Sequence, residues 1–217
     1  MLFSDYYKQC KKISKILDDD VFNRQYKFIL CLLIKTICIK ADRRVSNKVD
    51  ELIKFSINEL NCLMINELYL LCLFLNDNPL VKKKTFAKFH TSIKGGLENA
   101  VKNTAWDIYH ARLIEQEMKL YNSEDNTIEL PYFATNDQGV WDYFIVNPRK
   151  MVVIDEGIAT NVYAHNVGDM ESMLLNHEIY DQIVDVKEIQ KRKENVKNVP
   201  VDDILNKLLI DLKSVKI

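Results

Sequence analysis

Apolar residues recur at helical spacing through the first part of the chain. Residues 21–44 are apolar on nearly all sides, which is typical of a helix buried among others, and Asp20 stands at the expected N-cap position. A second helical pattern follows Ser46 over residues 47–60, and a third covers residues 64–79, where Pro79 gives a stop signal. The pattern therefore predicts a helical region over residues 1–92.

The pattern changes after Gly95 and Gly96. We expect one long helix from about Leu97 to Tyr121, then a polar turn and a short apolar strand ending near residue 137. A short helix over residues 139–147 and a β-branched strand over residues 148–157 follow. Because a helix connects the two strands, they are expected to be parallel, and residues 93–160 are predicted to form a small α/β portion.

Beyond residue 160, residues 170–198 predict one broken helix that ends in a charge run, and residues 200–217 predict an amphipathic helix with Pro200 in its first turn. The apolar face of that last helix packs on its own domain or binds a partner. The predicted fold class is helix-rich α/β, with a helical region (1–92), a parallel-sheet portion (93–160) and a C-terminal helical extension (161–217), or all three in one globular unit.

Composition supports this fold. The 217 residues are 47% hydrophobic and include only 5 Gly and 4 Pro, which favours long helices over many tight hairpins. The 5 Cys all lie in the first third, in apolar segments and without a C-x-x-C pair, so we expect core residues in a reducing compartment.

Charge and hydropathy limit the function. The net charge of −1 gives no overall electrostatic signal for nucleic acid, so such binding would need a local patch, for example Lys82, Lys83 and Lys84. The start of the chain lacks a signal-peptide pattern, and the longest apolar run, residues 28–39, is interrupted by Lys35. A soluble cytoplasmic protein that does not bind membranes is expected.

Candidate chemistry gathers in the α/β portion. Asn103, Asp107 and His110 project from roughly one side of the long helix, and Thr135 and Asp137 end the first strand. Two carboxylates that converge repel each other unless a proton or a cation lies between them. Oxygen ligands with few histidines favour Mg²⁺ or Mn²⁺, which commonly serve phosphodiester chemistry.

The segments "KNTAWDIYHARLIEQEM", "LPYFATNDQGVWDYF" and "KMVVIDEG" resemble the last third of a PIN-like nuclease domain, over residues 97–156. The resemblance implies Mg²⁺- or Mn²⁺-dependent hydrolysis, usually of RNA, by three or four carboxylates. It matches Asp107 to the helical acid, Asp137 to the acid of a T-x-D motif and Thr135 to the threonine that orients it. Asn103, one turn before Asp107, is a candidate support or water ligand.

The same family opens with a strand that ends in an acid, and the first 70 residues contain no clear strand of that kind. The nearest segment, residues 71–81, is interpreted as a helix C-terminus. Either the nuclease is incomplete and inactive, or a second polypeptide supplies the missing acids, or the N-terminal helices do. The candidate donors in those helices are Asp5, Asp50, Glu51, Glu59 and Glu67.

Structural roles remain as alternatives for each residue. Asp137 alternatively caps the helix that begins near Gly139, Asp107 alternatively pairs with Arg112, and Trp106 and Trp141 are expected to pack in the core.

The first functional hypothesis is a metal-dependent nuclease or nuclease subunit that acts on RNA, with DNA as a second substrate. The alternative is a non-catalytic α-rich interaction module with a degenerate nuclease-like scaffold, for example in a toxin–antitoxin or phage-defence system. Its protein partner, or a second copy of the chain, would bind through the N-terminal helices or the 200–217 helix.

Overall fold

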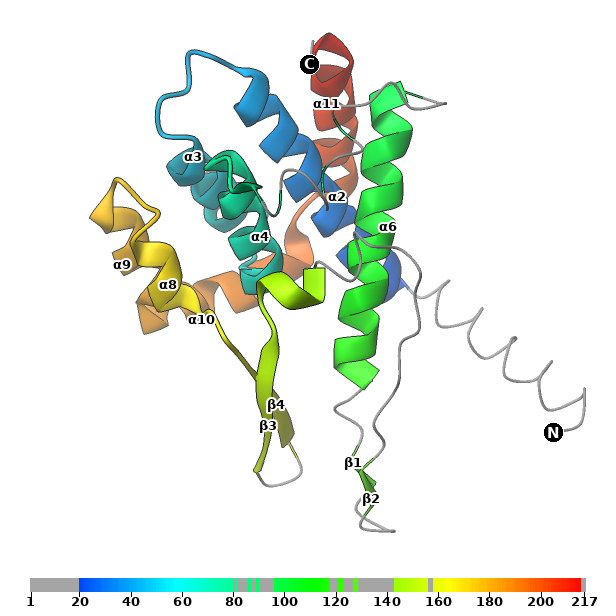
Figure 1. The fold of residues 1–217 in the computed structure, drawn as a ribbon, viewed down its shortest axis with the longest axis vertical. Helices are drawn as coiled ribbons and strands as arrows, with labels where there is room; N and C mark the ends of the chain where they lie inside the picture. Colours follow the sequence, from blue (N-terminus) through cyan, green and yellow to red (C-terminus); the bar gives the residue numbers. More distant parts are fainter. Residues whose placement is uncertain are drawn as a thin grey trace, which may run out of the picture.

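A computed structural model describes residues 20–79, 81, 86, 89, 96–117, 121–122, 127–128, 143–155 and 158–215. Helices dominate it, and two small hairpins project on one side (Figure 1). Residues 143–146 are helical as well, as predicted. The elements are α2 (Asp20–Ala41), α3 (Lys48–Lys54), the π-helix η1 (Phe55–Glu59), α4 (Ile65–Leu75), α6 (Gly96–Glu117), β1 (Tyr121–Asn122), β2 (Thr127–Ile128), β3 (Arg149–Asp155), β4 (Ile158–Tyr163), α8 (Val167–Glu171), α9 (His177–Val184), α10 (Val186–Asn195), the 3₁₀-helix η3 (Val196–Asn198) and α11 (Val201–Ser214).

Helix α2 is the centre of the core. It contacts α3, α4, α6 and α11, and its residues from Phe28 to Ile34 are all buried. A helix that is apolar on all sides needs neighbours on all sides, and α2 has them. The prediction of a buried helix in this region is therefore confirmed.

Helix α4 ends where the sequence indicated a helix C-terminus. Asn76 is its C-cap, and Asp77 adopts a left-handed backbone conformation with φ 57°. The Lys40 Nζ atom donates to the Phe74 carbonyl at 2.7 Å, which satisfies one of the carbonyls left open at a helix end. Residues 71–75 are thus helical and do not form the acid-bearing first strand of a PIN-like domain.

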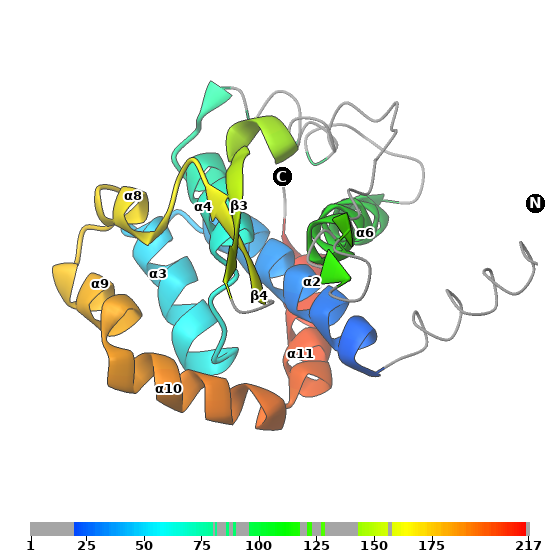
Figure 2. The ribbon, with the colours of Figure 1, turned by 90° about the horizontal axis from the view of Figure 1, so that it is seen from below.

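The C-terminal helices pack back on this core. The predicted broken helix is present as α8, α9 and α10, and α10 runs along one side of the molecule from α9 to α11 (Figure 2). Helix α11 contacts α2 and α6 and buries Val201, Leu208 and Leu212. Arg24 of α2 donates to the carbonyls of Val196 and Val199 at 2.8 and 2.7 Å. The apolar face of α11 is therefore occupied by the chain itself.

The described strands form two antiparallel pairs, β1–β2 and β3–β4. The helix-rich α/β class is confirmed, and so is a strand over residues 149–155, but its partner is β4 and not a parallel strand. Only two residues separate β3 from β4, and a link that short permits only antiparallel pairing. The first predicted strand, before residue 137, lies outside the described residues, so parallel pairing with it stays a prediction.

The described cysteines are core thiols, as expected. Cys31 and Cys72 are buried, Cys38 and Cys62 are partly buried, and all four are free. Burial raises the pKa of Cys31 and of Cys72 to about 12. Among the described helices, none is both long and apolar enough to cross a membrane.

Candidate functional site

Helix α6 divides into a packed side and an outer side. Ala105, Ile108 and Tyr109 are buried in the core. Asn103 is exposed, and Asp107 and His110 are partly exposed. The three predicted polar residues therefore lie off the packed side of the helix, where a carboxylate can still reach solvent and ligands.

Trp106 corrects one expectation, because its side chain is 41% exposed and does not fill the core. Its ring contacts His110 at a centroid distance of 4.6 Å and Tyr26 of α2 at 5.5 Å. Burial lowers the pKa of His110, and the charge of Asp107 acts in the opposite direction. Asp107 thus lies beside a half-buried histidine and an aromatic cluster on the outside of α6.

The other half of the predicted site cannot be placed. Thr135 and Asp137 lie outside the described residues, as do Lys82, Lys83 and Lys84. Among the residues that the structure does describe, no group of three or more His, Cys, Asp or Glu side chains could hold a metal ion. Binding of Mg²⁺ or Mn²⁺ therefore stays a prediction that depends on Asp137.

Two of the acids considered as further ligands have structural roles instead. The Asp50 carboxylate is buried and accepts a hydrogen bond from the Leu175 backbone N–H at 3.0 Å. Glu67 is 1% exposed and pairs with Arg112 Nη1 at 2.9 Å. Glu51 and Glu59 are exposed, and Asp5 lies outside the described residues. Asp50 and Glu67 are therefore committed to holding elements together.

The Glu67–Arg112 pair joins α4 to α6. Glu67 uses both carboxylate oxygens, at 2.9 and 3.2 Å from Arg112 Nη1, and its charge is the largest cause that raises the pKa of Arg112. A buried carboxylate needs such a partner because desolvation of an unpaired charge is very costly. Arg112 thus binds Glu67 in a contact between helices, and the expected pairing of Asp107 with Arg112 stays a prediction.

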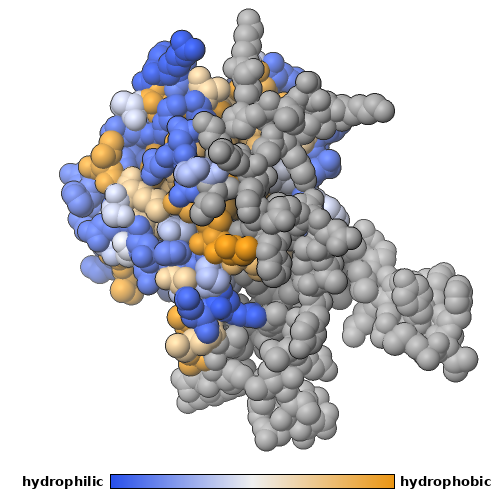
Figure 3. All heavy atoms as spheres, viewed as in Figure 1, coloured by the Kyte–Doolittle hydropathy of each residue, from blue (hydrophilic) through white to orange (hydrophobic). Residues whose placement is uncertain are grey.

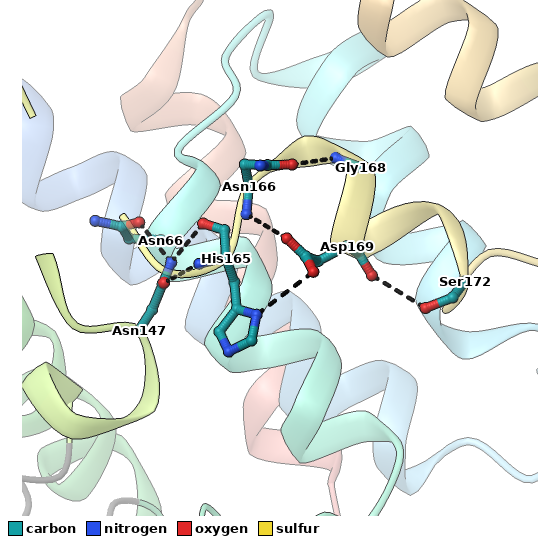
Figure 4. Close-up of polar contacts among 7 residues, drawn as sticks. All are labelled: Asn66, Asn147, His165, Asn166, Gly168, Asp169 and Ser172. Carbon is teal, nitrogen blue, oxygen red and sulfur yellow. Dashed lines mark hydrogen bonds and ion pairs between the residues drawn. The ribbon is translucent and has the colours of Figure 1, made fainter. Parts of the chain in front are cut away.

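A second polar cluster holds the base of the β3–β4 hairpin, and sequence reasoning missed it. Asn147 precedes β3, and His165 follows β4 (Figure 4). Asn147 Oδ1 accepts from the His165 backbone N–H at 2.8 Å, while Asn147 Nδ2 donates to the His165 carbonyl at 3.1 Å and to Asn66 Oδ1 at 3.0 Å. We call these three residues the asparagine clamp, since they tie both ends of the hairpin to α4.

Aromatic and capping contacts extend the clamp. The His165 ring stacks on Tyr69 of α4, with centroids 4.7 Å apart. Asn166 and Asp169 form a capping box at the start of α8, in which Asp169 Oδ2 accepts from the Asn166 backbone N–H at 2.8 Å (Figure 4). Side chains of α4 and of α8 therefore both contact the base of the hairpin.

The hairpin itself exposes apolar side chains. Met151 is 56% exposed, Val153 44% and Val162 37%. Met151 is paired with Val162 across the two strands, so all three lie on one face. Figure 3 shows apolar side chains on the projecting hairpin, below the helical body. Such a face indicates an interaction surface more strongly than single apolar residues elsewhere do.

A shallow surface pocket lies between α2, η1 and α11. Its lining contains charged residues of both signs, and the basic ones are Lys35 and Lys207. The mixed charge favours no particular ligand. The acidic residues are Glu59, Asp203 and Asp211.

Comparison with known proteins gave no match: no protein-family model, curated protein or solved structure shows significant similarity to this chain.

Proposed function

We propose that the protein is a metal-dependent nuclease of the PIN-like class that hydrolyses phosphodiester bonds in RNA, with DNA as a second substrate. The observation that carries this proposal is the position of Asp107, in the middle of α6 and off its packed side. The helical residues 143–146 and the strand β3 then follow in the order that the resemblance implies.

The residues proposed to hold the metal are oxygen donors. Asp107 and Asp137 would bind Mg²⁺ or Mn²⁺, with Asn103 supporting a bound water and Thr135 orienting Asp137. A bound divalent cation activates water and neutralises charge that develops on the phosphate. His110, next to Asp107 and with a lowered pKa, adds no positive charge of its own at neutral pH and so does not compete with a cation.

Substitution of the two acids tests the proposal. Cleavage of single-stranded RNA would be measured with Mn²⁺ for the wild type, Asp107→Asn and Asp137→Asn. We expect a loss of roughly 100-fold or more in each variant, because a ligand charge is removed while the side-chain shape is kept. Asp181→Asn, on the exposed surface of α9, is the matched control and should keep full activity. Wild-type rates in both site variants would remove the metal-ligand role.

A second function, as a protein interaction module without catalysis, is favoured by the exposed apolar face of the β3–β4 hairpin. If the wild type does not cleave RNA or DNA with Mn²⁺ or Mg²⁺ and binding assays identify a protein partner at the hairpin, this second function replaces the first.

A further inference from the structure

Helix α6 has an exposed tryptophan next to the acid that carries the proposed function. Trp106 directly precedes Asp107 and is 41% exposed, although a tryptophan side chain is highly buried on average. At about 100° per residue, His110 and Asn103 lie between this tryptophan and the acid on the surface of the helix. The tryptophan therefore belongs to the same outer side of α6 as the predicted polar residues.

Two neighbouring rings hold the Trp106 side chain. Tyr26 contacts it with an angle of 79° between the ring planes and His110 with an angle of 67°, and both contacts are of the edge-to-face type. Tyr26 comes from α2, which packs beside α6 (Figure 1). A side chain that its neighbours already hold loses less conformational entropy when a ligand binds, so more of the interaction energy remains as affinity.

The surroundings of this exposed ring favour a nucleobase over an apolar protein surface. Over the described side chains of α6, residues 96–113, Trp106 is the only large apolar residue that is exposed. Its neighbours on the outer side, Asn103, Asp107 and His110, are polar or ionisable. A single aromatic ring among polar groups suits a ligand with one flat apolar face and a charged backbone, and a nucleotide has both.

We propose that Trp106 stacks on a base of a single-stranded nucleic acid substrate and thereby positions a neighbouring phosphate at Asp107. Adjacent Cα atoms are about 3.8 Å apart, so the two side chains can contact the same nucleotide or two consecutive ones. The inference rests on the proposed nuclease function and narrows its substrate to single strands, because the bases of a duplex are stacked on one another. Stacking uses the face that all bases share, so a weak sequence preference is expected.

Binding is measured separately from cleavage, by the fluorescence anisotropy of a labelled oligoadenylate RNA at low salt with EDTA. Trp106→Ala should bind about tenfold more weakly than the wild type, because stacking of one base on an aromatic side chain contributes roughly 5- to 150-fold to affinity. Trp106→Phe keeps an aromatic face and should bind close to the wild type. Leu175→Ala, which shortens a 71% exposed apolar side chain outside α6, is the matched control and should bind like the wild type.

Tryptophan fluorescence gives a second, independent measurement. A base that stacks on an indole quenches its emission, so unlabelled oligoadenylate should quench the fluorescence of the wild type. Trp106→Phe should lose most of this quenching although it still binds the RNA. Equal quenching in both proteins would overturn the proposal, because the stacked residue would then not be Trp106. Both Trp106 variants should keep the circular dichroism of the wild type, since this side chain lies outside the buried core.

Cleavage by Asp107→Asn with Mn²⁺ separates this proposal from the proposed function. Loss of cleavage in Asp107→Asn together with wild-type binding by Trp106→Ala would leave the nuclease in place and overturn the stacking. Weak binding by Trp106→Ala together with wild-type cleavage by Asp107→Asn would support the stacking and remove the metal-ligand role of Asp107. A wild type that binds no single-stranded RNA, or that binds duplex RNA as tightly as the single strand, would overturn the stacking as well.

Discussion

Two apolar segments of this protein have opposite surroundings. In α4, Leu68, Leu70 and Leu71 are at most 1% exposed, and neighbouring helices cover the segment. In the β3–β4 hairpin, Met151 and Val153 are about half exposed, although residues 151–154 are all apolar. Apolar side chains therefore stabilise the fold in α4, whereas in the hairpin they stay at the surface.

The difference shows where a partner is to be expected. Burial of a large aliphatic side chain contributes about 1.5–3 kcal/mol, so α4 gains its stability inside the chain. The hairpin gains much less from burial, and the asparagine clamp bonds its base to α4. Apolar surface that the fold does not use, on an element that the fold holds firmly, is typical of a binding surface.

The largest expected contrast comes from truncating one side chain in each segment. Leu68→Ala should lower the free energy of unfolding by about 2–5 kcal/mol, because the cavity in the core cannot close fully. Val153→Ala should change it by about 0.5 kcal/mol or less, since that side chain already contacts water. Urea unfolding at low protein concentration measures both.

The two losses in the free energy of unfolding, compared with each other, show whether the hairpin belongs to the folding core. A cost at Val153 as large as that at Leu68 would mean that the hairpin is part of the folding core, and the comparison would fail. The m-value should stay unchanged in both variants if the native and unfolded states keep their exposed areas.

The clamp should have an intermediate effect. Asn147→Ala removes three hydrogen bonds and leaves the Asn66 side-chain oxygen and the His165 backbone groups without these partners. We expect a loss of about 2–4 kcal/mol, from roughly 1–3 kcal/mol for each unsatisfied buried group with partial rescue by water. Hydrogen exchange should accelerate in β3 and β4 more than in α2. Asn206→Ala, at an exposed site of α11, is the control, and equal exchange in the hairpin of both variants would show that Asn147 does not hold it.

Periodicity predicted the helices well because each depends on local spacing and burial. The long helix after Gly95, the broken helix predicted over residues 170–198 and the amphipathic α11 all follow the apolar pattern. The hairpin was missed although its sequence contained a signal: two β-branched runs separated by Glu156 and Gly157. The predicted helix over residues 139–147 suggested a parallel neighbour for β3. The two-residue link to β4 adds an antiparallel neighbour, and the strand predicted before residue 137 lies outside the described residues.

The polar contacts could not be predicted in the same way. Asn66 and Asn147 are 81 residues apart in sequence, and Glu67 and Arg112 are 45 apart. No spacing rule links such pairs, because their contact depends on how α4, α6 and the hairpin pack. Periodicity placed Asp107 on one side of its helix with Asn103 and His110, and this side lies off the packed one, whereas its proposed partner Asp137 lies outside the described residues.

The smallest expected effect concerns the capping box below the hairpin. The backbone N–H of Asn166 is the largest cause that lowers the pKa of Asp169, and His165 adds to it at 3.5 Å. A carboxyl group with a lower pKa in the folded state stabilises the fold above its unfolded pKa of about 3.9, and this contribution is lost as the pH falls through the folded pKa.

Asp169→Asn keeps an oxygen acceptor without the charge, so it should melt at a lower temperature than the wild type at pH 7. The two melting temperatures should converge in acid below the folded pKa. Asp181→Asn, at an exposed site of α9, controls for general charge effects. A difference between wild type and Asp169→Asn that persists unchanged into strong acid would assign the effect to shape and not to the charge at the hairpin base.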